Sequence, residues 1–422
     1  MAGESITRRT LLIRVAPALL LALPALVTRA GGFELPAVAA MAVFGLGVLA
    51  AAILLMWAAE TARADMPGAL AIAVLALIAV LPEYAVDLYY AYAAGTRPQY
   101  TAYAAANMTG ANRLLVGVGW ALVVLAFALA VRRASGGTGG GRGRHAAPGT
   151  GRRDVRLTPL HRIELGFLAL AAVLGFIPAL TGEIGWYISV VLIALYVLYI
   201  ARISRHPRQG VEELAGVPAR LAALPKTRRR AVTWTGFALG AIVVFVSAEP
   251  FANALVDAGT SLGIDEFLLV QWLAPFASEA PELLVAAMFA WRLRDADAIG
   301  TLLSSKVNQW TLLIGTLPLA YRIGGGAWSL PLDSRQTEEV LLTAAQTVLG
   351  LAFLVDLVFR RWEAAVLFGL FAVQFVLPSE MARLVISGVY LAIGFSVLIA
   401  RYRDVAAAMS TVVRPRRRSR PR

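Results

Sequence analysis

The sequence predicts an all-α membrane protein that crosses the bilayer about twelve times. Hydrophobic residues make up 59% of the 422 residues and charged residues only 15%, which is too apolar for a water-soluble chain of this length. The apolar residues form long runs of roughly the 20 residues that a helix needs to cross a bilayer. The basic residues are concentrated between these runs, as is typical of the cytoplasmic loops of membrane proteins.

Twelve apolar ranges are the predicted membrane-spanning helices. They are 11–28, 36–58, 67–95, 100–131, 163–180, 184–201, 231–255, 263–291, 296–321, 338–358, 362–378 and 383–400. The first range follows Thr7-Arg8-Arg9-Thr10, which looks like a twin-arginine export signal. We interpret it as a first transmembrane helix preceded by basic residues, because no clear Ala-x-Ala cleavage site follows.

The net charge of +13 arises largely from three segments with eight basic residues each, 24 of the 39 in the chain: 132–162, 202–230 and 401–422. We number each gap by the span that precedes it. These segments follow the fourth, sixth and twelfth spans, and every even-numbered gap lies on the same side of the membrane as the N-terminus. The basic charge of these gaps therefore predicts that both termini are cytoplasmic. The distribution argues against nucleic acid and makes the lipid bilayer the expected partner, with anionic lipids at the basic loops as an alternative role for the charge. The Arg, Ala and Gly richness indicates a bacterium, hence the plasma membrane.

The same pattern divides the chain into eight regions. They are an N-terminal helix (1–35), a first repeat region (36–133), a Gly- and Arg-rich cytoplasmic linker (134–160), the remaining helices of the first half (161–203), a basic cytoplasmic loop (204–230), a second repeat half (231–378), a last helix (379–402) and a basic cytoplasmic tail (403–422). The glycines of the linker lack the Gly-Lys-Ser/Thr ending of a phosphate-binding loop. The absence of cysteine excludes disulfides and cysteine metal sites.

A proline–glutamate pair interrupts two of the predicted spans. Leu81-Pro82-Glu83 lies in the third span and Ala280-Pro281-Glu282 in the eighth, 199 residues later. Proline breaks or kinks a helix, and a glutamate within a span is costly, so this coincidence needs a functional explanation. Because the two spans are five apart, the repeats run in opposite directions. Two inverted five-helix repeats with broken helices, plus extra terminal helices, are typical of secondary transporters.

A polar stretch follows each interrupted span. The first runs from Asn107 to Arg113 and the second from Gly300 to Gln309. Their small, hydroxyl and amide side chains allow close helix packing and supply oxygen ligands for a cation.

These segments resemble the two alpha repeats of the sodium/calcium exchanger superfamily, in which a G-T-S-L-P-E break precedes a G-N-x-x-G-S-N-x-x-N/D stretch. The second repeat is the more similar one, through Ala277-Ser278-Glu279-Ala280-Pro281-Glu282. The resemblance implies that Glu83 and Glu282 are the main ligands of the transported metal cation. It places further candidate ligands at Glu279, Ser278, Ser305, Gln309, Asn107 and Asn112.

The sequence departs from the family pattern at several ligand positions. The Thr-Ser pair before the first glutamate is replaced by Ala79 and Val80, and the asparagine that matches Asn112 in the first repeat is Lys306 in the second. We hypothesise that Lys306 pairs with Glu279 or Glu282 and substitutes for one bound cation. Arg113 and Asp87 are also expected to tune the charge of the site, because Arg113 can neutralise an acid such as Asp87.

The resemblance implies a secondary antiporter that exchanges Ca²⁺ or another cation for Na⁺ or H⁺ by alternating access, without a cofactor and without covalent chemistry. The lost ligands and Lys306 keep a sodium/proton antiporter without calcium transport as an alternative, as well as a degenerate homologue that does not transport. A membrane-bound transferase is disfavoured, because such enzymes usually need a substantial soluble loop with acidic or histidine chemistry, and the long loops here are basic.

Overall fold

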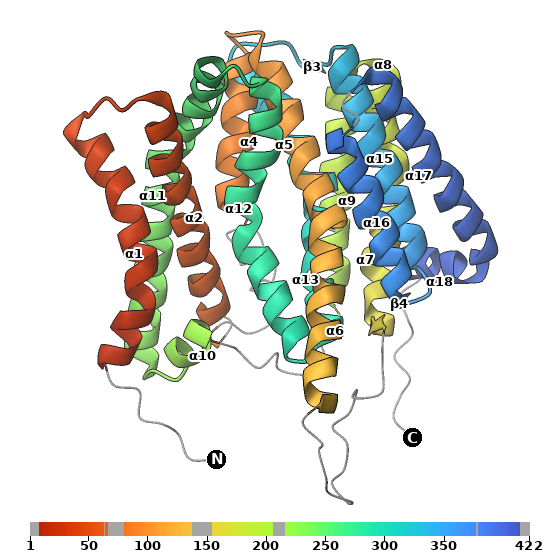
Figure 1. The fold of residues 1–422 in the computed structure, drawn as a ribbon, viewed down its shortest axis with the longest axis horizontal. Coiled ribbons are helices and arrows are strands. Elements are labelled where there is room, and N and C mark those ends of the chain that lie inside the picture. Colours follow the sequence, from red (N-terminus) through yellow and green to blue (C-terminus); the bar gives the residue numbers. More distant parts are fainter. Residues whose placement is uncertain are drawn as a thin grey trace, which may run out of the picture. The chain divides into compact units, whose positions relative to one another are not determined.

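The computed structural model describes residues 8–62, 64–65, 80–136, 154–205, 216–376 and 379–413. Several predictions fall partly outside these residues. They concern the N-terminal region before residue 8, the start of the third span as far as residue 79, most of the linker 134–160, part of the loop 204–230, the end of the eleventh span at 377–378, and the end of the tail. Within the described residues the chain is helical, with short strands in its connections (Figure 1). The chain forms two compact units, residues 1–93 with 200–281 and residues 94–199 with 282–422.

Unit 1 is built from long apolar helices. Its elements are α1 (Arg8–Gly31), α2 (Ala37–Ala62), α4 (Leu81–Ala94), α10 (Gly216–Ala222), α11 (Lys226–Leu262) and the first part of α12 (Glu266–Trp291). The helices α1, α2 and α11 pack against one another, as Figure 1 shows on the left. Glycine in the left-handed conformation ends α11 at Gly263, where an L side chain would be strained.

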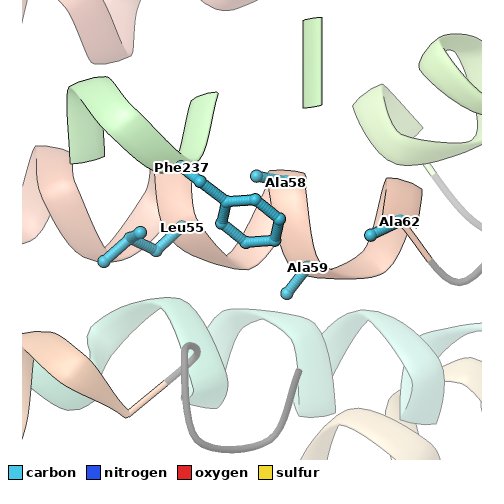
Figure 2. Packing of buried hydrophobic residues seen from close by; sticks show 5 residues of the cluster. All are labelled: Leu55, Ala58, Ala59, Ala62 and Phe237. Atoms are coloured by element: carbon cyan, nitrogen blue, oxygen red, sulfur yellow. The ribbon is translucent and has the colours of Figure 1, made fainter. Parts of the chain in front are cut away.

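The packing of α2 against α11 depends on small residues. The ring of Phe237 lies over Leu55, Ala58 and Ala59 in an apolar cluster of buried side chains (Figure 2). Leu81, the first residue of α4, packs against this cluster. A β-carbon at Gly240 would lie 2.7 Å from the Cγ of Leu55, so the two helices approach at a distance that only glycine allows.

We therefore expect Gly240→Val to destabilise unit 1. The added side chain must push Leu55 or the backbone aside, and such overpacking costs about 1–3 kcal/mol. Gly388→Val is the matched control, because a β-carbon at Gly388 meets nothing within 4 Å. Thermal unfolding in detergent, followed by size-exclusion chromatography, should show a lower melting temperature for Gly240→Val alone. Equal melting temperatures for the two variants would contradict the close packing of α2 against α11.

An ion pair joins the end of α2 to the start of α11. The Arg229 guanidinium contacts both carboxylate oxygens of Asp65, at 2.5 and 2.8 Å. It lowers the pKa of the Asp65 carboxyl from its ordinary value of 3.8. Because the folded-state pKa is depressed, the stabilisation is complete above pH 3.8 and is lost as the pH falls through the lowered pKa. A change of pH around neutrality therefore leaves the ion pair between Asp65 and Arg229 intact.

Unit 2 contains the remaining helices and four short strands. In the first half of the chain these are α5 (Tyr100–Leu114), η1 (Leu115–Gly119), α6 (Trp120–Gly136), β1 (Val155–Arg156), η2 (Pro159–His161), α7 (Arg162–Leu174), α8 (Phe176–Thr181), β2 (Glu183–Ile184) and α9 (Trp186–Ile203). In the second half, after the end of α12, they are α13 (Asp295–Asn308), η3 (Gln309–Leu313), α14 (Ile314–Ile323), β3 (Leu330–Pro331), α15 (Ser334–Leu354), β4 (Val358–Phe359), α16 (Arg361–Val376), α17 (Glu380–Ala400) and α18 (Tyr402–Val413).

The helix α15 is the most buried of the long helices in unit 2 and packs against α5, α7, α8 and α17. A capping box starts it, in which the Asp333 carboxylate accepts from the Gln336 amide while the Gln336 side chain reaches back to the backbone N–H of Asp333. Such boxes satisfy the unpaired donors of a helix N-terminus. The buried polar residues of α15 are therefore held on a well-defined helix.

Both units take equivalent helices from the two halves of the sequence. With the predicted offset of five spans, α2 corresponds to α11 and α4 to α12, and these helices supply unit 1. In unit 2, α5–α6 corresponds to α13–α14, α7–α8 corresponds to α15, and α9 corresponds to α16. The compact units are thus not the two halves of the sequence, because each unit combines segments from both.

The strands show the same internal symmetry. Strand β1 pairs antiparallel with β4, and β2 pairs antiparallel with β3. The strands β1 and β3 precede equivalent spans, the fifth and the tenth, and β2 and β4 precede the sixth and the eleventh. Exchanging the two halves therefore converts one strand pair into the other, which confirms the predicted repeat within unit 2.

Each predicted span contains a helix in its described part, but the number of membrane crossings stays a prediction. Within the described residues, eight helices are long and apolar enough to cross a membrane. Others fall short for local reasons: α16 has 16 residues, and η3 divides the ninth span into two shorter helices. The amphipathic helix α18, which packs on α7, was not predicted and lies where the sequence indicates only a basic tail.

Candidate functional site

In unit 1 the candidate ligand of the first repeat lies at the start of α4. The helix begins at Leu81, so Pro82 occupies the first turn, where its missing N–H removes no helical hydrogen bond. Glu83 follows in the same turn, where the positive end of the helix dipole favours a carboxylate. Glu83 is 3% exposed and Asp87, one turn later on the same face, is fully buried. Asp87 therefore lies inside the protein and not at a solvated helix end.

Two tyrosines fix α4 against α11. The Tyr89 hydroxyl donates to the side-chain oxygen of Asn253 at 2.9 Å, and the Tyr90 hydroxyl donates to the backbone carbonyl of Ala252 at 3.1 Å. Both tyrosines lie nearly two turns after Glu83 and hold the orientation of the helix that carries it. The two tyrosines therefore position the carboxylate face of α4.

The candidate ligands of the second repeat lie on α12. This helix runs from Glu266 to Trp291 with Pro275 and Pro281 inside it, so Pro281 lies within its helix, whereas Pro82 lies at the start of α4. Because Pro281 has no N–H, the carbonyl of Ala277 loses its usual helical donor. Glu279 is buried and Glu282 partly buried, and both lie on one face of α12, three residues apart.

Ser278 is buried on the same helix and donates its hydroxyl proton to the backbone carbonyls of Ala274 and Pro275, at 3.2 and 3.3 Å. Its oxygen lone pairs stay available as acceptors. The boundary between the two units falls after Pro281, so Glu83, Ser278 and Glu279 belong to unit 1 and Glu282 to unit 2.

In unit 2 the two polar stretches are marked by π-helical turns at equivalent positions. The turns η1 and η3 begin at Leu115 and Gln309, which the repeat alignment matches to each other. In η1 the N–H of Trp120 bonds to the carbonyl of Leu115, five residues earlier, instead of four. Single π-turns inside α-helices occur frequently at functional sites. Because the π-turns recur at equivalent positions, the residues three positions before them, Asn112 and Lys306, are also equivalent and are candidates for a functional role.

Lys306 contacts Asn112 directly. The Lys306 Nζ donates to the Asn112 Oδ1 at 2.8 Å and lies 3.4 Å from the backbone carbonyl of the same residue. It also lies 4.6 Å from the ring centroid of Trp310, within cation–π range. Both Lys306 and Asn112 are fully buried. The hydrogen-bond partner of Lys306 within unit 2 is therefore the repeat-equivalent asparagine and not the predicted Glu282, while its predicted pairing with Glu279, which lies in unit 1, stays a prediction.

Three more predicted ligands are buried in unit 2. Asn107 is 1% exposed, Ser305 7% and Gln309 0%. Among the described residues, the amide of Asn107 and the hydroxyl of Ser305 have no hydrogen-bond partner. Buried polar groups without a partner in the protein are costly, and such groups are suited to bind an ion, a ligand or water. Within the same described ranges, no group of three or more His, Asp and Glu side chains is close enough to hold a metal ion.

Arg113 is held by a buried network that the sequence alone did not predict. It forms an ion pair with Glu339 of α15 at 2.5 Å and donates to the side-chain oxygen of Gln374 at 3.0 Å. Arg383 of α17 extends the network, at 3.9 Å from Glu339 and 2.8 Å from Glu338. The Arg113 and Glu339 side chains are only 2% and 4% exposed.

Within unit 2 the carboxylate partner of Arg113 is therefore Glu339 on α15, while its predicted neutralisation of Asp87, which lies in unit 1, stays a prediction. A signal for this partner was present in the sequence. Glu339, Thr343, Gln346 and Thr347 recur at helical spacing at the start of the tenth predicted span, which places one polar face on a membrane helix. All four side chains are buried in the structure.

The fold, the internal repeats and the buried polar residues define a secondary transporter of inorganic cations. The family model described as sodium/calcium exchanger protein matches residues 36–204 and 232–379, which is most of the chain. The chain belongs to the sodium/calcium exchanger family.

Individual proteins agree with this assignment. A crystal structure titled as the H⁺/Ca²⁺ exchanger CAX is 40% identical, covers 96% of this chain and 98% of its own, and has a TM-score of 0.86. The Ca²⁺/H⁺ antiporter YfkE shares the fold, with a TM-score of 0.54, 15% identity and coverage of 91% and 100%. A protein named "Putative antiporter CaxA" from Alkalimonas amylolytica is 28% identical over 139 residues. That match covers 33% of this chain and 42% of the relative's length.

Proposed function

We propose that this chain is a secondary antiporter that exchanges Ca²⁺ for H⁺ across the membrane. The observation that carries the proposal is the recurrence of a glutamate directly after a proline at equivalent positions of the two repeats, buried in the first repeat and partly buried in the second. Glu83 follows Pro82 on α4, and Glu282 follows Pro281 on α12. The 40% identity to the H⁺/Ca²⁺ exchanger CAX over nearly the whole chain supports the choice of ions.

The carboxylates can couple the two ions by competition. Ca²⁺ takes six to eight oxygen ligands, and two carboxylates balance its charge. A carboxylate that has bound a proton is neutral and no longer attracts the cation. We infer from the family resemblance that Glu83 and Glu282 bind either Ca²⁺ or protons, and that amide, hydroxyl and carbonyl oxygens of the two repeats serve as further ligands. The candidates for these oxygens are Ser278, Asn107, Ser305, Gln309 and the carbonyl of Ala277.

Flux in proteoliposomes tests the ion assignment. Protein-loaded vesicles with an acidic lumen should accumulate ⁴⁵Ca²⁺ from a neutral, Na⁺-free medium, while vesicles with a Na⁺-loaded lumen and no pH gradient should not. Uptake driven by Na⁺ alone would contradict the proposal and favour a sodium-coupled exchanger. Proton flux coupled to Na⁺, with no Ca²⁺ movement, would favour the sodium/proton alternative, and no flux under any gradient would favour a degenerate homologue.

We further propose that the chain lies in a bacterial plasma membrane with both termini in the cytoplasm. The support is the concentration of basic residues in the even-numbered gaps, which anionic lipid headgroups of the inner leaflet would reinforce.

Single introduced cysteines test this orientation, because the chain has no cysteine of its own. Ala327→Cys lies in the ninth gap and Thr227→Cys in the sixth, and both positions are exposed. A membrane-impermeant maleimide should label Ala327→Cys in intact cells and Thr227→Cys only after lysis. The reverse result would contradict the orientation.

A further inference from the structure

The contact between Lys306 and Asn112 joins equivalent positions of the two inverted repeats. Each residue lies three positions before a π-helical turn, η1 after Asn112 and η3 after Lys306. The symmetry that relates the two repeats therefore exchanges the positions of Asn112 and Lys306, but the two residues differ in chemistry. The first repeat presents an amide oxygen at this point, whereas the second presents an ammonium group.

The surroundings of the Lys306 ammonium are those of a bound monovalent cation. Its contacts are two oxygens of Asn112, one from the side chain and one from the backbone, and the face of the Trp310 ring. The Asn112 amide nitrogen donates to the Met108 carbonyl at 2.8 Å, which turns the side-chain oxygen toward Lys306. The Nζ–Oδ1 distance of 2.8 Å leaves no space for an ion between the two groups.

The contacts of Lys306 within the described part of unit 2 are with neutral groups. Within the described part of unit 2, no carboxylate forms an ion pair with Lys306. The adjacent Arg113 has its own partner in Glu339 and adds a second positive charge nearby. Within unit 2, neutral oxygens and a ring therefore surround a fully buried lysine, an arrangement that is costly and needs a function.

We propose that Lys306 is a specificity-determining residue, a tethered cation that occupies the position where two repeat-related amides would otherwise bind a free monovalent ion. An asparagine at position 306 would face Asn112 and complete a symmetric set of oxygen ligands, the kind of ligand that hard cations such as Na⁺ prefer. The lysine fills that position permanently. The transport cycle consequently neither requires nor responds to Na⁺. This inference rests on the proposed function for its transport readout.

The test compares wild type with Lys306→Asn, which restores the repeat symmetry, and with Lys306→Arg, which keeps a charged donor. The first readout is ²²Na⁺ binding to the purified, detergent-solubilised full chain, which does not depend on transport. We expect no saturable Na⁺ binding to wild type or Lys306→Arg, and saturable binding to Lys306→Asn. The second readout is pH-driven Ca²⁺ uptake with and without Na⁺ in the external medium. Na⁺ should change uptake by less than about twofold in wild type and by about tenfold in Lys306→Asn, within the usual range of coupling between ligands.

Two results would overturn the inference. One is a folded Lys306→Asn protein that binds no Na⁺ and transports Ca²⁺ with the same Na⁺ independence as wild type. The other is saturable Na⁺ binding to wild type that competes with Ca²⁺, and this measurement decides the matter alone if Lys306→Asn does not fold. A wild-type protein without Ca²⁺/H⁺ exchange would refute the proposed function, while the Na⁺-binding comparison would still decide the role of Lys306.

Discussion

Replacing Glu83 and Glu282 by glutamine is expected to abolish Ca²⁺ uptake. The substitution keeps the volume of each side chain, so packing around α4 and α12 is preserved while the negative charges are removed. Loss of a residue that merely supports a metal ligand costs 10- to 100-fold in affinity or activity, so loss of both proposed charged ligands should cost more than about 100-fold. Each single variant should also fall to a small fraction of wild-type uptake, because a divalent cation would then meet an unbalanced charge.

The matched control is Glu249→Gln in α11. Glu249 is about half exposed and pairs with Arg29 at 3.4 Å, on the surface of unit 1. Its replacement should leave Ca²⁺ uptake unchanged. Monodisperse elution of all variants would show that they fold. Uptake by the double variant at more than a tenth of the wild-type rate would remove Glu83 and Glu282 from the proposed ligand set.

Breaking the Arg113–Glu339 pair is expected to cause the largest loss of stability. Removing one partner of a buried pair leaves a buried charge uncompensated, which costs about 3–5 kcal/mol. Arg113→Met should therefore lower the melting temperature strongly, and so should Glu339→Gln. Arg113→Met combined with Glu339→Met should be less harmful than the sum of the single changes, because an apolar pair of similar volume leaves no charge behind.

Arg29→Met provides the control for this experiment, since an exposed pair such as Arg29–Glu249 contributes at most about 1 kcal/mol. Thermal unfolding of all these variants in the same detergent gives the comparison. If Arg113→Met unfolds at the wild-type temperature, the buried network does not hold α5 against α15. Additive losses in the double variant would contradict the direct coupling of the two side chains.

Most of the fold could be predicted from the sequence, because membrane helices are read from the length of apolar runs. All twelve predicted ranges contain a helix in their described parts, and the repeat predicted from two proline–glutamate pairs agrees with the symmetry of the strands. The family resemblance, drawn from Ser278 to Glu282 and from Gly300 to Gln309, is confirmed by the match of the family model. Prediction was weaker where tertiary contacts decide local structure, as in the two π-turns and in α18.

The candidate site was predicted less completely. Sequence spacing identified buried polar residues on α4, α5, α12 and α13, and the low exposure of Glu83, Glu279, Asn107 and Asn112 agrees with an internal location. The partners that Lys306 and Arg113 have within unit 2, Asn112 and Glu339, were not predicted, because charge alone cannot show which helix faces which. Arg113 contacts Glu339, which is 226 positions later in the chain, and only the packing of α5 against α15 brings them together. The ligand roles themselves stay predictions.

The reverse of the uptake assay tests the exchange of Ca²⁺ for H⁺ most directly. Proteoliposomes loaded with Ca²⁺ and a fluorescent pH indicator are diluted into Ca²⁺-free, Na⁺-free medium, with the membrane potential held near zero by K⁺ and valinomycin. Outward movement of Ca²⁺ should bring protons in, so the lumen acidifies. The acidification should be absent in the Glu83→Gln/Glu282→Gln protein. Ca²⁺ efflux without a change in luminal pH would contradict coupled Ca²⁺/H⁺ exchange.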